Sequence, residues 1–204
     1  MDDEALASES FNTGGFATLP GSLRIRTLEL YIFQTGEIPD SEIPFLTQFF
    51  KDPQSDDTSL VALGGVIGLL DPDTPLLHWF MNLFPECPVS TQLLLAPILI
   101  ASGQGPILPT MISILNHTIE SKLALTIQHA IQYSDLGVFN VVFFALHRAT
   151  PIGKQRLGAI LIAKGFEYCK PFLLALPMNP YRDCFATWFG ESFLAFEQKH
   201  HLIG

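Results

Sequence analysis

The chain of 204 residues is built from apolar blocks of about 12 to 15 residues, separated by short breaks rich in Pro, Gly, Asp and Ser. This rhythm begins near Ser22 and continues almost to the C-terminus. Blocks of this length favour helices, because strands usually run for only about 4 to 8 residues. We therefore predict eleven helices, over residues 22–35, 41–51, 57–70, 74–84, 89–102, 106–117, 121–133, 136–149, 152–165, 168–177 and 181–200.

Residues that start and stop helices stand at the edges of these blocks. A capping side chain precedes a proline at Thr74-Pro75, Thr150-Pro151 and Asn179-Pro180. Proline suits the first helical position, because its missing N–H would have no partner there. Further cap clusters are Asp56-Asp57-Thr58, Ser90-Thr91 and Ser134-Asp135. Glycine adopts the left-handed C-terminal conformation at low cost, and the predicted helix ends carry Gly36, Gly103 and Gly165.

The spacing of the helix starts predicts how the helices are arranged. Starts recur about every 15 to 17 residues, and the short loops between them make neighbouring helices antiparallel. A period of about 32 residues for a helix pair is typical of helical repeats. The predicted fold class is therefore all-α, an antiparallel stack of about eleven short helices. Because the blocks share no residue-level consensus, a HEAT-like α-solenoid and an irregular helical bundle both stay open.

The polar start of the chain differs from the rest. Residues 1–20 predict a flexible acidic arm in which Phe11 and Phe16 are candidate anchors. Residues 21–204 are expected to form a single all-helical domain. Within one of its most apolar helices, Pro97 is expected to kink or shorten the helix.

Charge is scarce and unevenly distributed. Hydrophobic residues make up 48% of the chain and charged residues 15%, with a net charge of −9. Thirteen acids and three bases lie in the stretch that ends at Asp73, whereas seven acids and eight bases follow it. This acidic N-terminal part argues against nucleic acid and against anionic membrane surfaces as partners. It predicts other protein subunits as partners, at least one of them partly basic, in a hetero-oligomer.

The chain is expected to be cytoplasmic, with no membrane insertion. Its longest apolar stretches, residues 60–70 and 93–101, are well short of the about 20 residues that span a bilayer. The N-terminus lacks the basic flank of a signal peptide. The irregularly spaced Cys87, Cys169 and Cys184 are typical of buried thiols in a reducing compartment.

No motif for catalysis or for a cofactor stands out. The glycines Gly64, Gly65 and Gly68 lie inside a predicted helix, which favours close helix packing over a phosphate loop. The six histidines lack the spacing of a helical zinc site. Asp71 and Asp73, like other paired acids, are interpreted as helix-start caps. We therefore expect no catalytic residue, no cofactor and no metal.

The last predicted helix carries the strongest candidate for a docking face. Aromatic side chains recur there at helical spacing, and such side chains dominate binding hot spots. The alternative is that they close the open end of the stack. The candidate protein-binding residues are Phe185, Trp188, Phe189, Phe193 and Phe196, together with the acidic pair Asp56 and Asp57.

Two resemblances accompany these patterns. The period of the blocks resembles HEAT-like helical repeats over residues 22–200. The length, the acidic start (Met1-Asp2-Asp3-Glu4, then Glu9) and the apolar helices are similar to LvgA-like adaptors of the Dot/Icm type IVB secretion machinery. That resemblance implies a helical adaptor that sits with other small acidic subunits on a coupling complex and helps recruit effectors.

The leading hypothesis is a non-enzymatic adaptor or chaperone-like subunit of a larger assembly, which recruits protein substrates to a bacterial type IV secretion system. One alternative is an enzyme whose site is assembled from the scattered histidines His117, His129 and His147. Another is a carrier of lipid or of another hydrophobic ligand, since a stack of apolar helices can enclose a cavity.

Overall fold

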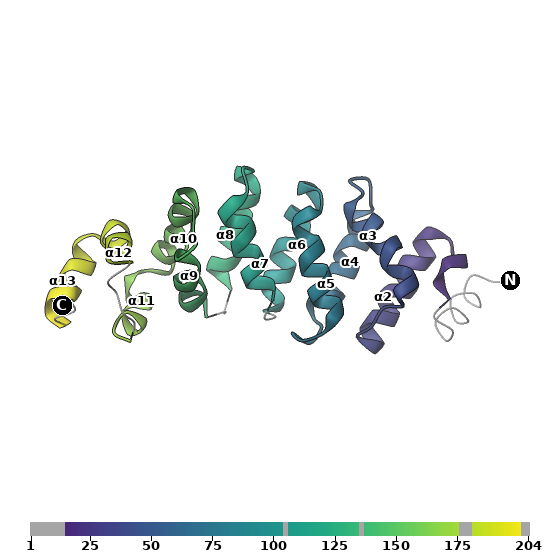
Figure 1. The fold of residues 1–204 in the computed structure, drawn as a ribbon, viewed down its shortest axis with the longest axis horizontal. Helices are drawn as coiled ribbons and strands as arrows, with labels where there is room; N and C mark the ends of the chain where they lie inside the picture. Colours follow the sequence, from purple (N-terminus) through teal and green to yellow (C-terminus); the bar gives the residue numbers. More distant parts are fainter. Residues whose placement is uncertain (1–14, 104–105, 135–136, 176–180, 201–204) are drawn as a thin grey trace. The chain divides into compact units, whose positions relative to one another are not determined.

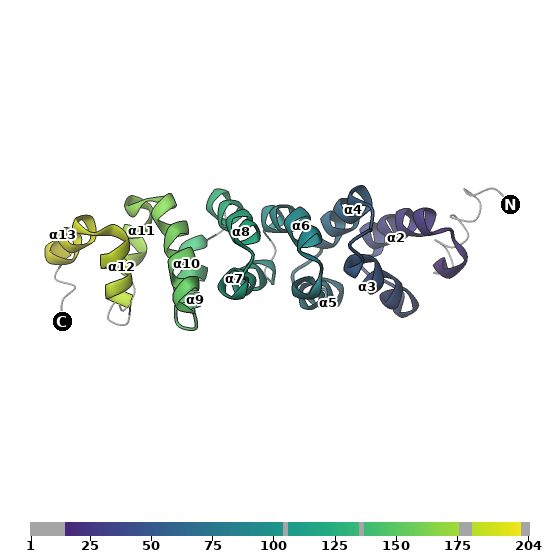
Figure 2. The same ribbon diagram turned by 90° about the horizontal axis from the view of Figure 1, so that it is seen from above.

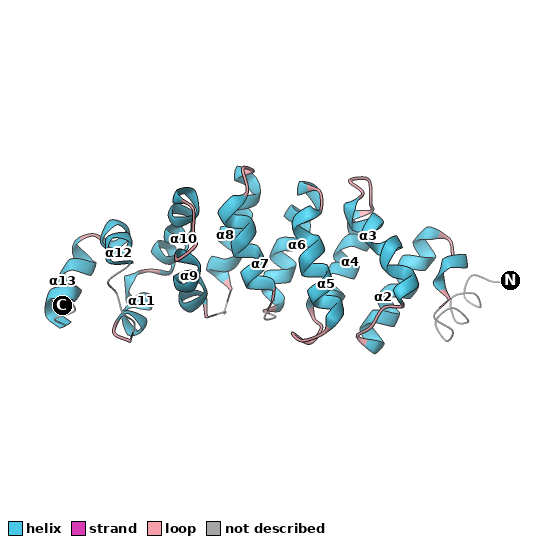
Figure 3. Cartoon of the chain, viewed as in Figure 1, coloured by secondary structure: helices cyan, strands magenta, loops and turns pink. Residues whose placement is uncertain are grey.

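In the computed structural model, which describes residues 15–103, 106–134, 137–175 and 181–200, every regular element is helical. Figure 3 shows only helices and loops in this part of the chain, so the predicted all-α fold class is confirmed. The α-helices are α2 (Gly21–Thr35), α3 (Ile43–Lys51), α4 (Asp57–Gly68), α5 (Pro75–Leu83), α6 (Val89–Ser102), α7 (Ile107–His117), α8 (Ser121–Tyr133), α9 (Val138–Leu146), α10 (Pro151–Lys164), α11 (Phe166–Leu173), α12 (Arg182–Phe189) and α13 (Glu191–His200). Three short 3-10 helices are η1 (Phe16–Thr18), η2 (Asp40–Glu42) and η3 (Phe84–Glu86).

The chain divides into two compact units, residues 1–110 (unit 1) and residues 111–204 (unit 2). The boundary falls within α7.

The helices of unit 1 form two layers (Figures 1 and 2). In one layer α4 packs against both α2 and α6, so the even-numbered helices of the unit contact one another in sequence order. The other layer holds α3 and α5, where the rings of Phe50 and Phe80 lie 4.6 Å apart. Packing between alternate helices is the arrangement of stacked helix pairs in helical repeats.

Two of the three glycines of α4 allow α6 to approach closely, as the sequence predicted. A Cβ atom on Gly64 would lie 2.8 Å from Leu95 Cδ2, and one on Gly68 would lie 3.1 Å from Leu99 Cδ2. Both leucines are completely buried. They flank Pro97, and α6 continues through this proline without shortening. Burial of two leucines, at about 2 kcal/mol each, offsets the hydrogen bond that the proline removes.

The cap residues predicted from the sequence are only partly confirmed. Asp56 caps α4 by accepting a 2.8 Å hydrogen bond from the Ser59 N–H, and Thr150 caps α10 by accepting one of 3.0 Å from the Gly153 N–H. Thr74 stands at the same position before α5 but makes no such bond. The cap prediction for Ser90-Thr91 is wrong, because α6 already begins at Val89 and takes both residues into its first turn. Asn179 and Asp135 lie outside the described residues.

Glycines end three helices where the sequence predicted. Gly36 after α2, Gly103 after α6 and Gly165 after α10 all have positive φ angles, of 70°, 74° and 89°. Side chains other than glycine rarely adopt this conformation. The helix ends of this fold are thus largely encoded locally.

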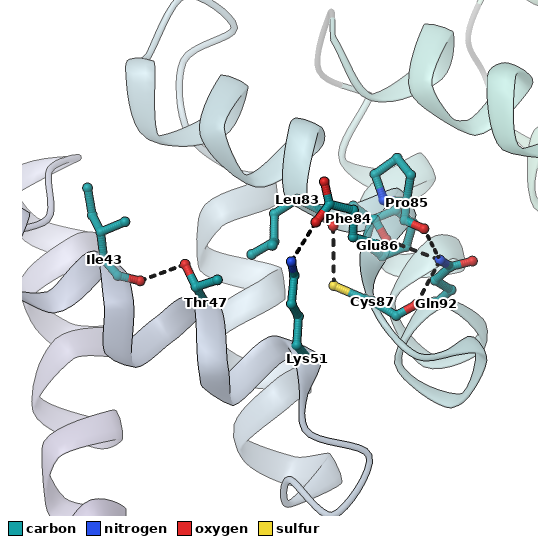
Figure 4. Close-up of polar contacts among 9 residues, drawn as sticks. All are labelled: Ile43, Thr47, Lys51, Leu83, Phe84, Pro85, Glu86, Cys87 and Gln92. Atoms are coloured by element: carbon teal, nitrogen blue, oxygen red, sulfur yellow. Dashed lines mark hydrogen bonds and ion pairs between the residues drawn. The ribbon is translucent and has the colours of Figure 1, made fainter.

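A short turn after α5 is stabilised by one buried glutamine (Figure 4). Gln92 Nε2 donates to the carbonyl oxygens of Phe84, Pro85 and Cys87, at 3.2, 3.0 and 2.9 Å. The Phe84 carbonyl also accepts the backbone N–H of Cys87 at 3.2 Å, and the glutamine adds donors for carbonyl groups at the end of η3. Figure 4 also shows Lys51 of α3 reaching Glu86, an ion pair that joins α3 to this turn.

In unit 2, α10 lies between α8 and α12, and α11 contacts α9. The rings of Phe139 and Phe172 stack at 4.8 Å between these last two helices. Basic side chains of α10 bind the C-terminal ends of other helices. Arg156 Nη1 donates to the carbonyl oxygens of Leu115 and Thr118 at 2.7 and 2.9 Å, and Lys164 Nζ donates to that of Ser134 at 2.9 Å. A cation is favourable there, because the helix dipole is negative at that end.

The two ends of the chain differ from the sequence expectation. The helix predicted over residues 181–200 is two helices, because Gly190 has a φ of 51° and interrupts it. Arg182 of α12 bridges the break, with bonds of 2.6 and 2.8 Å to the carboxylate of Glu197 in α13. Of the expected arm, residues 1–14, with Phe11, lie outside the described residues. Phe16 is an anchor as predicted, completely buried with its ring edge-on to Tyr31.

Candidate functional site

A pocket of about 810 Å³ opens in unit 1 between two connections of the chain. One is the α2–α3 connection and the other the α4–α5 connection, which lie at the same end of the unit's helices, the lower edge in Figure 3. The N-terminal turns of α3 and α5 complete the lining. The stacking of successive helix pairs therefore creates the pocket, since residues more than thirty positions apart in sequence line its two sides.

Local hydrogen bonds shape both connections. Gly36 ends α2 with a left-handed turn, and its N–H donates to the Ile32 carbonyl at 2.8 Å. In the other connection, Asp71 Oδ1 accepts a 3.0 Å bond from the Asp73 N–H, which forms a tight Asx turn just before α5. Asp71 thus stabilises the turn rather than the first N–H groups of α5.

A buried ion pair supports the α3 side of the pocket. Arg24 Nε of α2 donates to Glu42 Oε2 of η2 at 2.8 Å, and the Glu42 side chain is only 1% exposed. The guanidinium also stacks on the ring of Phe45, 3.9 Å from its centre. Because Asp40 and Ile43 lie within two residues of Glu42 and line the pocket, this pair attaches their wall to α2.

The pocket combines an apolar lining with an acidic one. Its apolar side chains include the half-buried Trp79 and a group of aliphatic residues, Ile38, Ile43, Leu70 and Leu76. Four exposed carboxylates accompany them, Glu37, Asp40, Asp71 and Asp73. Within the described part of the chain, no Lys or Arg lines the pocket or forms an ion pair with these four.

The charge of unit 1 as a whole agrees with this pocket. Unit 1 holds 14 acids and 3 bases, a net charge of −11, whereas unit 2 holds 6 acids and 8 bases, a net charge of +2. Two of the three bases in unit 1 are already paired, Arg24 with Glu42 and Lys51 with Glu86. The negative charge of unit 1 is thus largely uncompensated within the unit.

The sequence-predicted acidic residues lie outside the pocket lining. Asp56 is the N-cap of α4, and its hydrogen bonds from the Ser59 N–H and hydroxyl lower the pKa of its carboxyl. Asp57 is exposed in the first turn of α4. Sequence reasoning missed Glu37 and Asp40 and treated Asp71 and Asp73 only as caps. One pattern in the sequence could have indicated them. Glu37 and Asp40 lie in one break between predicted helices, and Asp71 and Asp73 lie in the break that follows one helix pair later.

The predicted aromatic residues lie in unit 2, and most of them are in its core. Phe185 and Phe193 are completely buried, and Phe196 is 7% exposed. Trp188 and Phe189 are half-buried. Trp188 packs against α10, where a Cβ atom on Gly158 would lie 2.3 Å from the indole. These side chains join α12 and α13 to the rest of unit 2, where Phe189 and Phe196 both contact the ring of Phe166.

The histidines suggested for an enzyme site are all on the surface. His117, His129 and His147 are exposed, and His117 Nδ1 lies 2.8 Å from the Ser113 carbonyl oxygen. Among the residues that the structure describes, no three His, Cys, Asp or Glu side chains are grouped closely enough to bind a metal ion.

Two of the three thiols are buried and resist ionisation. Burial raises the pKa of Cys87 to about 11 and that of Cys169 to about 12. Because only the thiolate is a good nucleophile, neither thiol is activated for catalysis at neutral pH. Cys184 is half-buried, and all three thiols are free.

Comparison with known proteins adds no family to this picture. No protein-family model, curated protein sequence or solved structure matches the chain. Among the described helices, none is both long enough and apolar enough to cross a membrane.

Proposed function

We propose that this chain is a non-enzymatic adaptor subunit of a cytoplasmic multiprotein assembly, and that it binds a partly basic protein partner through unit 1. The observation that carries the proposal is the uncompensated negative charge of unit 1, which has 14 acids and 3 bases. A field of one sign attracts a partner of the opposite sign and raises the rate of association. Asp56 and Asp57, at the N-terminal end of α4, contribute to this acidic surface in addition to the pocket carboxylates.

The fold supports a binding role as well. Stacked helix pairs present loops and helix ends in regular order, and proteins of this architecture use such surfaces to bind other proteins. Several large apolar side chains are also exposed, such as Phe33 at 67%, Leu69 at 64% and Phe144 at 73%. In the assembly that we propose, partner subunits cover part of this surface, so the chain works as a hetero-oligomer.

The proposed setting is a bacterial type IV secretion system, where the adaptor recruits protein substrates. This part rests on the resemblance of the acidic start and apolar helices to LvgA-like adaptors. The acidic unit 1 supports it, because an adaptor between a coupling complex and its substrates needs a surface that selects partners by charge.

The test is affinity purification of the tagged full-length chain from its native cells, with quantitative mass spectrometry. We expect at least one protein in stoichiometric amount, carrying a basic segment, and we expect its release as NaCl is raised from about 0.15 M to about 0.5 M. Exposed charge pairs weaken over that range, because the Debye length falls below about 8 Å. A chain that migrates as a monomer in the native lysate and retains no protein contradicts the proposal.

A further inference from the structure

The lining of the unit 1 pocket restricts what can occupy it. A purely apolar ligand would leave four carboxylates next to a surface from which it excludes water, and that is unfavourable. A metal ion is disfavoured, because the described carboxylates are not grouped closely enough to bind one. The occupant must therefore carry positive charge and apolar surface together.

The helix ends sharpen this requirement. Acids before α5 are favourable, because the N-terminal end of a helix is positive. Glu37, however, directly follows Gly36 at the C-terminal end of α2, where the helix dipole is negative and disfavours a carboxylate. Asp73 makes no capping hydrogen bond to α5, but the helix dipole favours its charge, whereas the dipole of α2 disfavours that of Glu37. A cation in the pocket would compensate Glu37 and the α2 dipole at once.

We propose that this pocket binds an arginine side chain together with a neighbouring apolar side chain, both from a short segment of the protein partner. The proposal rests on the proposed function and specifies its contact site. Arginine fits better than lysine, since its planar guanidinium stacks on aromatic rings, forms paired bonds to carboxylates and loses hydration more readily. Trp79 supplies the ring, and the acids of both connections supply the carboxylates.

The size of the pocket agrees with such a segment. Pockets that bind compact ligands measure about 300 to 1,000 Å³, and this one measures about 810 Å³. The same chain already contains the interaction that we infer, because the guanidinium of Arg24 stacks on Phe45 while it binds the carboxylate of Glu42.

The experiment uses the ¹⁵N-labelled full chain, which has two tryptophans and hence two indole N–H signals in an NMR spectrum. The probe is the peptide acetyl-Ala-Arg-Leu-Ala-amide, and the comparison peptide replaces arginine with citrulline, its neutral isostere. We expect saturable movement of the Trp79 indole signal with the arginine peptide, and at least about tenfold weaker binding of the citrulline peptide. The Trp188 signal in unit 2 should stay unchanged.

Two charge-matched variants separate the pocket from the general charge of unit 1. Asp71→Asn/Asp73→Asn removes two charges from the pocket, and asparagine still offers an oxygen for the Asx turn. Glu29→Gln/Asp52→Asn removes two charges from elsewhere in unit 1, and neither side chain lines the pocket. Asp52 makes the same kind of turn as Asp71, accepting a 2.9 Å bond from the Gln54 N–H. We expect the affinity for the arginine peptide to fall at least about tenfold in the pocket variant and less than about twofold in the control variant.

Several results would overturn the inference. These are equal binding of the arginine and citrulline peptides, equal weakening by the two variants, no movement of the Trp79 signal, or self-association that fills the pocket with a second copy of the chain. In the native purification, a partner that wild type and the pocket variant retain equally would contradict binding through the pocket. It would still be consistent with the adaptor role. Absence of any partner would contradict the adaptor role. The peptide titration would then still test whether the pocket binds an arginine side chain.

Discussion

Arg24 Nε donates a 2.8 Å hydrogen bond to Glu42 Oε2 across 18 residues of sequence, and joins the start of α2 to the turn that precedes α3. The Glu42 side chain is 1% exposed and that of Arg24 is 16% exposed. Glu42 Oε1 is buried without a hydrogen-bond partner among the described residues. The carboxylate therefore depends on Arg24 for compensation of its charge.

Arg24→Met should lower the free energy of unfolding by about 3 kcal/mol, because it leaves a buried carboxylate without its cation. The double variant Arg24→Met/Glu42→Leu should recover most of this loss, since apolar side chains of similar volume can replace a buried ion pair. Urea unfolding followed by circular dichroism measures both. Equal stability of the single and double variants would show that Glu42 does not depend on Arg24.

Gly158 permits the close approach of Trp188 to α10, and alanine there should be destabilising. The added Cβ atom would lie 2.3 Å from the indole, so the ring must move, at a cost of about 1 to 3 kcal/mol. Gly65→Ala is the control, because the nearest atom to its Cβ is 4.0 Å away. That change should be neutral or stabilising by up to about 1 kcal/mol. Thermal unfolding distinguishes the two, and the order of stability should be Gly65→Ala above wild type above Gly158→Ala.

Thr150 and Thr74 share the same sequence context before a proline but differ in the structure. The Thr150 hydroxyl accepts from the Gly153 N–H and donates to the Asn116 carbonyl, each at 3.0 Å. Thr150→Ala should therefore cost about 1 kcal/mol or more in unfolding free energy. Thr74→Ala loses no capping bond and should cost less than about 0.5 kcal/mol. Equal losses in denaturant unfolding would contradict the assigned caps.

Because two thiols are buried, we expect the free energy of unfolding to depend on pH in the alkaline range. Their pKa values in the folded chain, about 11 for Cys87 and about 12 for Cys169, exceed the ordinary value of 9.0. The folded state therefore holds these protons more tightly. Stability is unaffected below about pH 9 and falls as the pH rises towards the folded pKa values.

This dependence can be measured as the urea midpoint of wild type between about pH 8 and about pH 10.5. We expect the decline to be smaller in Cys87→Ala/Cys169→Ala, whose unfolded state has fewer thiols to ionise. At about pH 8 a thiol reagent should label Cys184 first, and the two buried thiols only on unfolding. Rapid labelling of all three thiols in the folded chain would contradict the burial of Cys87 and Cys169.

The sequence alone predicted most helix positions in this chain, and the reason is local. Asp56 and Thr150 cap helices through hydrogen bonds to backbone N–H groups three residues away. Gly36 and Gly103 end helices because of their own backbone freedom. The exceptions also have local causes, such as the break at Gly190, where an apolar aromatic pattern suggested one continuous helix.

The residues that line the pocket could not be predicted from the sequence, because only helix packing brings them together. Glu37 and Asp71 stand 34 positions apart, and each lies in an ordinary polar break between helices. They line one pocket only because α4 packs beside α2, and a Cβ atom on Gly36 would lie within 3.9 Å of Leu70. The same holds for the aromatic residues of the last two helices. Spacing placed Phe185 and Phe193 on one stripe, but packing decided that this stripe faces the core.

Sequence by itself thus determined the all-α class, most helix ends and the acidic character of the first half, because these follow from backbone preference and from the count of charges. Tertiary structure alone decided which of the acids gather around Trp79 and which serve as caps. The physical reason is that charge proximity depends on how helix pairs stack. Stacking depends on close contacts such as that of Gly64 with Leu95, which join residues far apart in the chain.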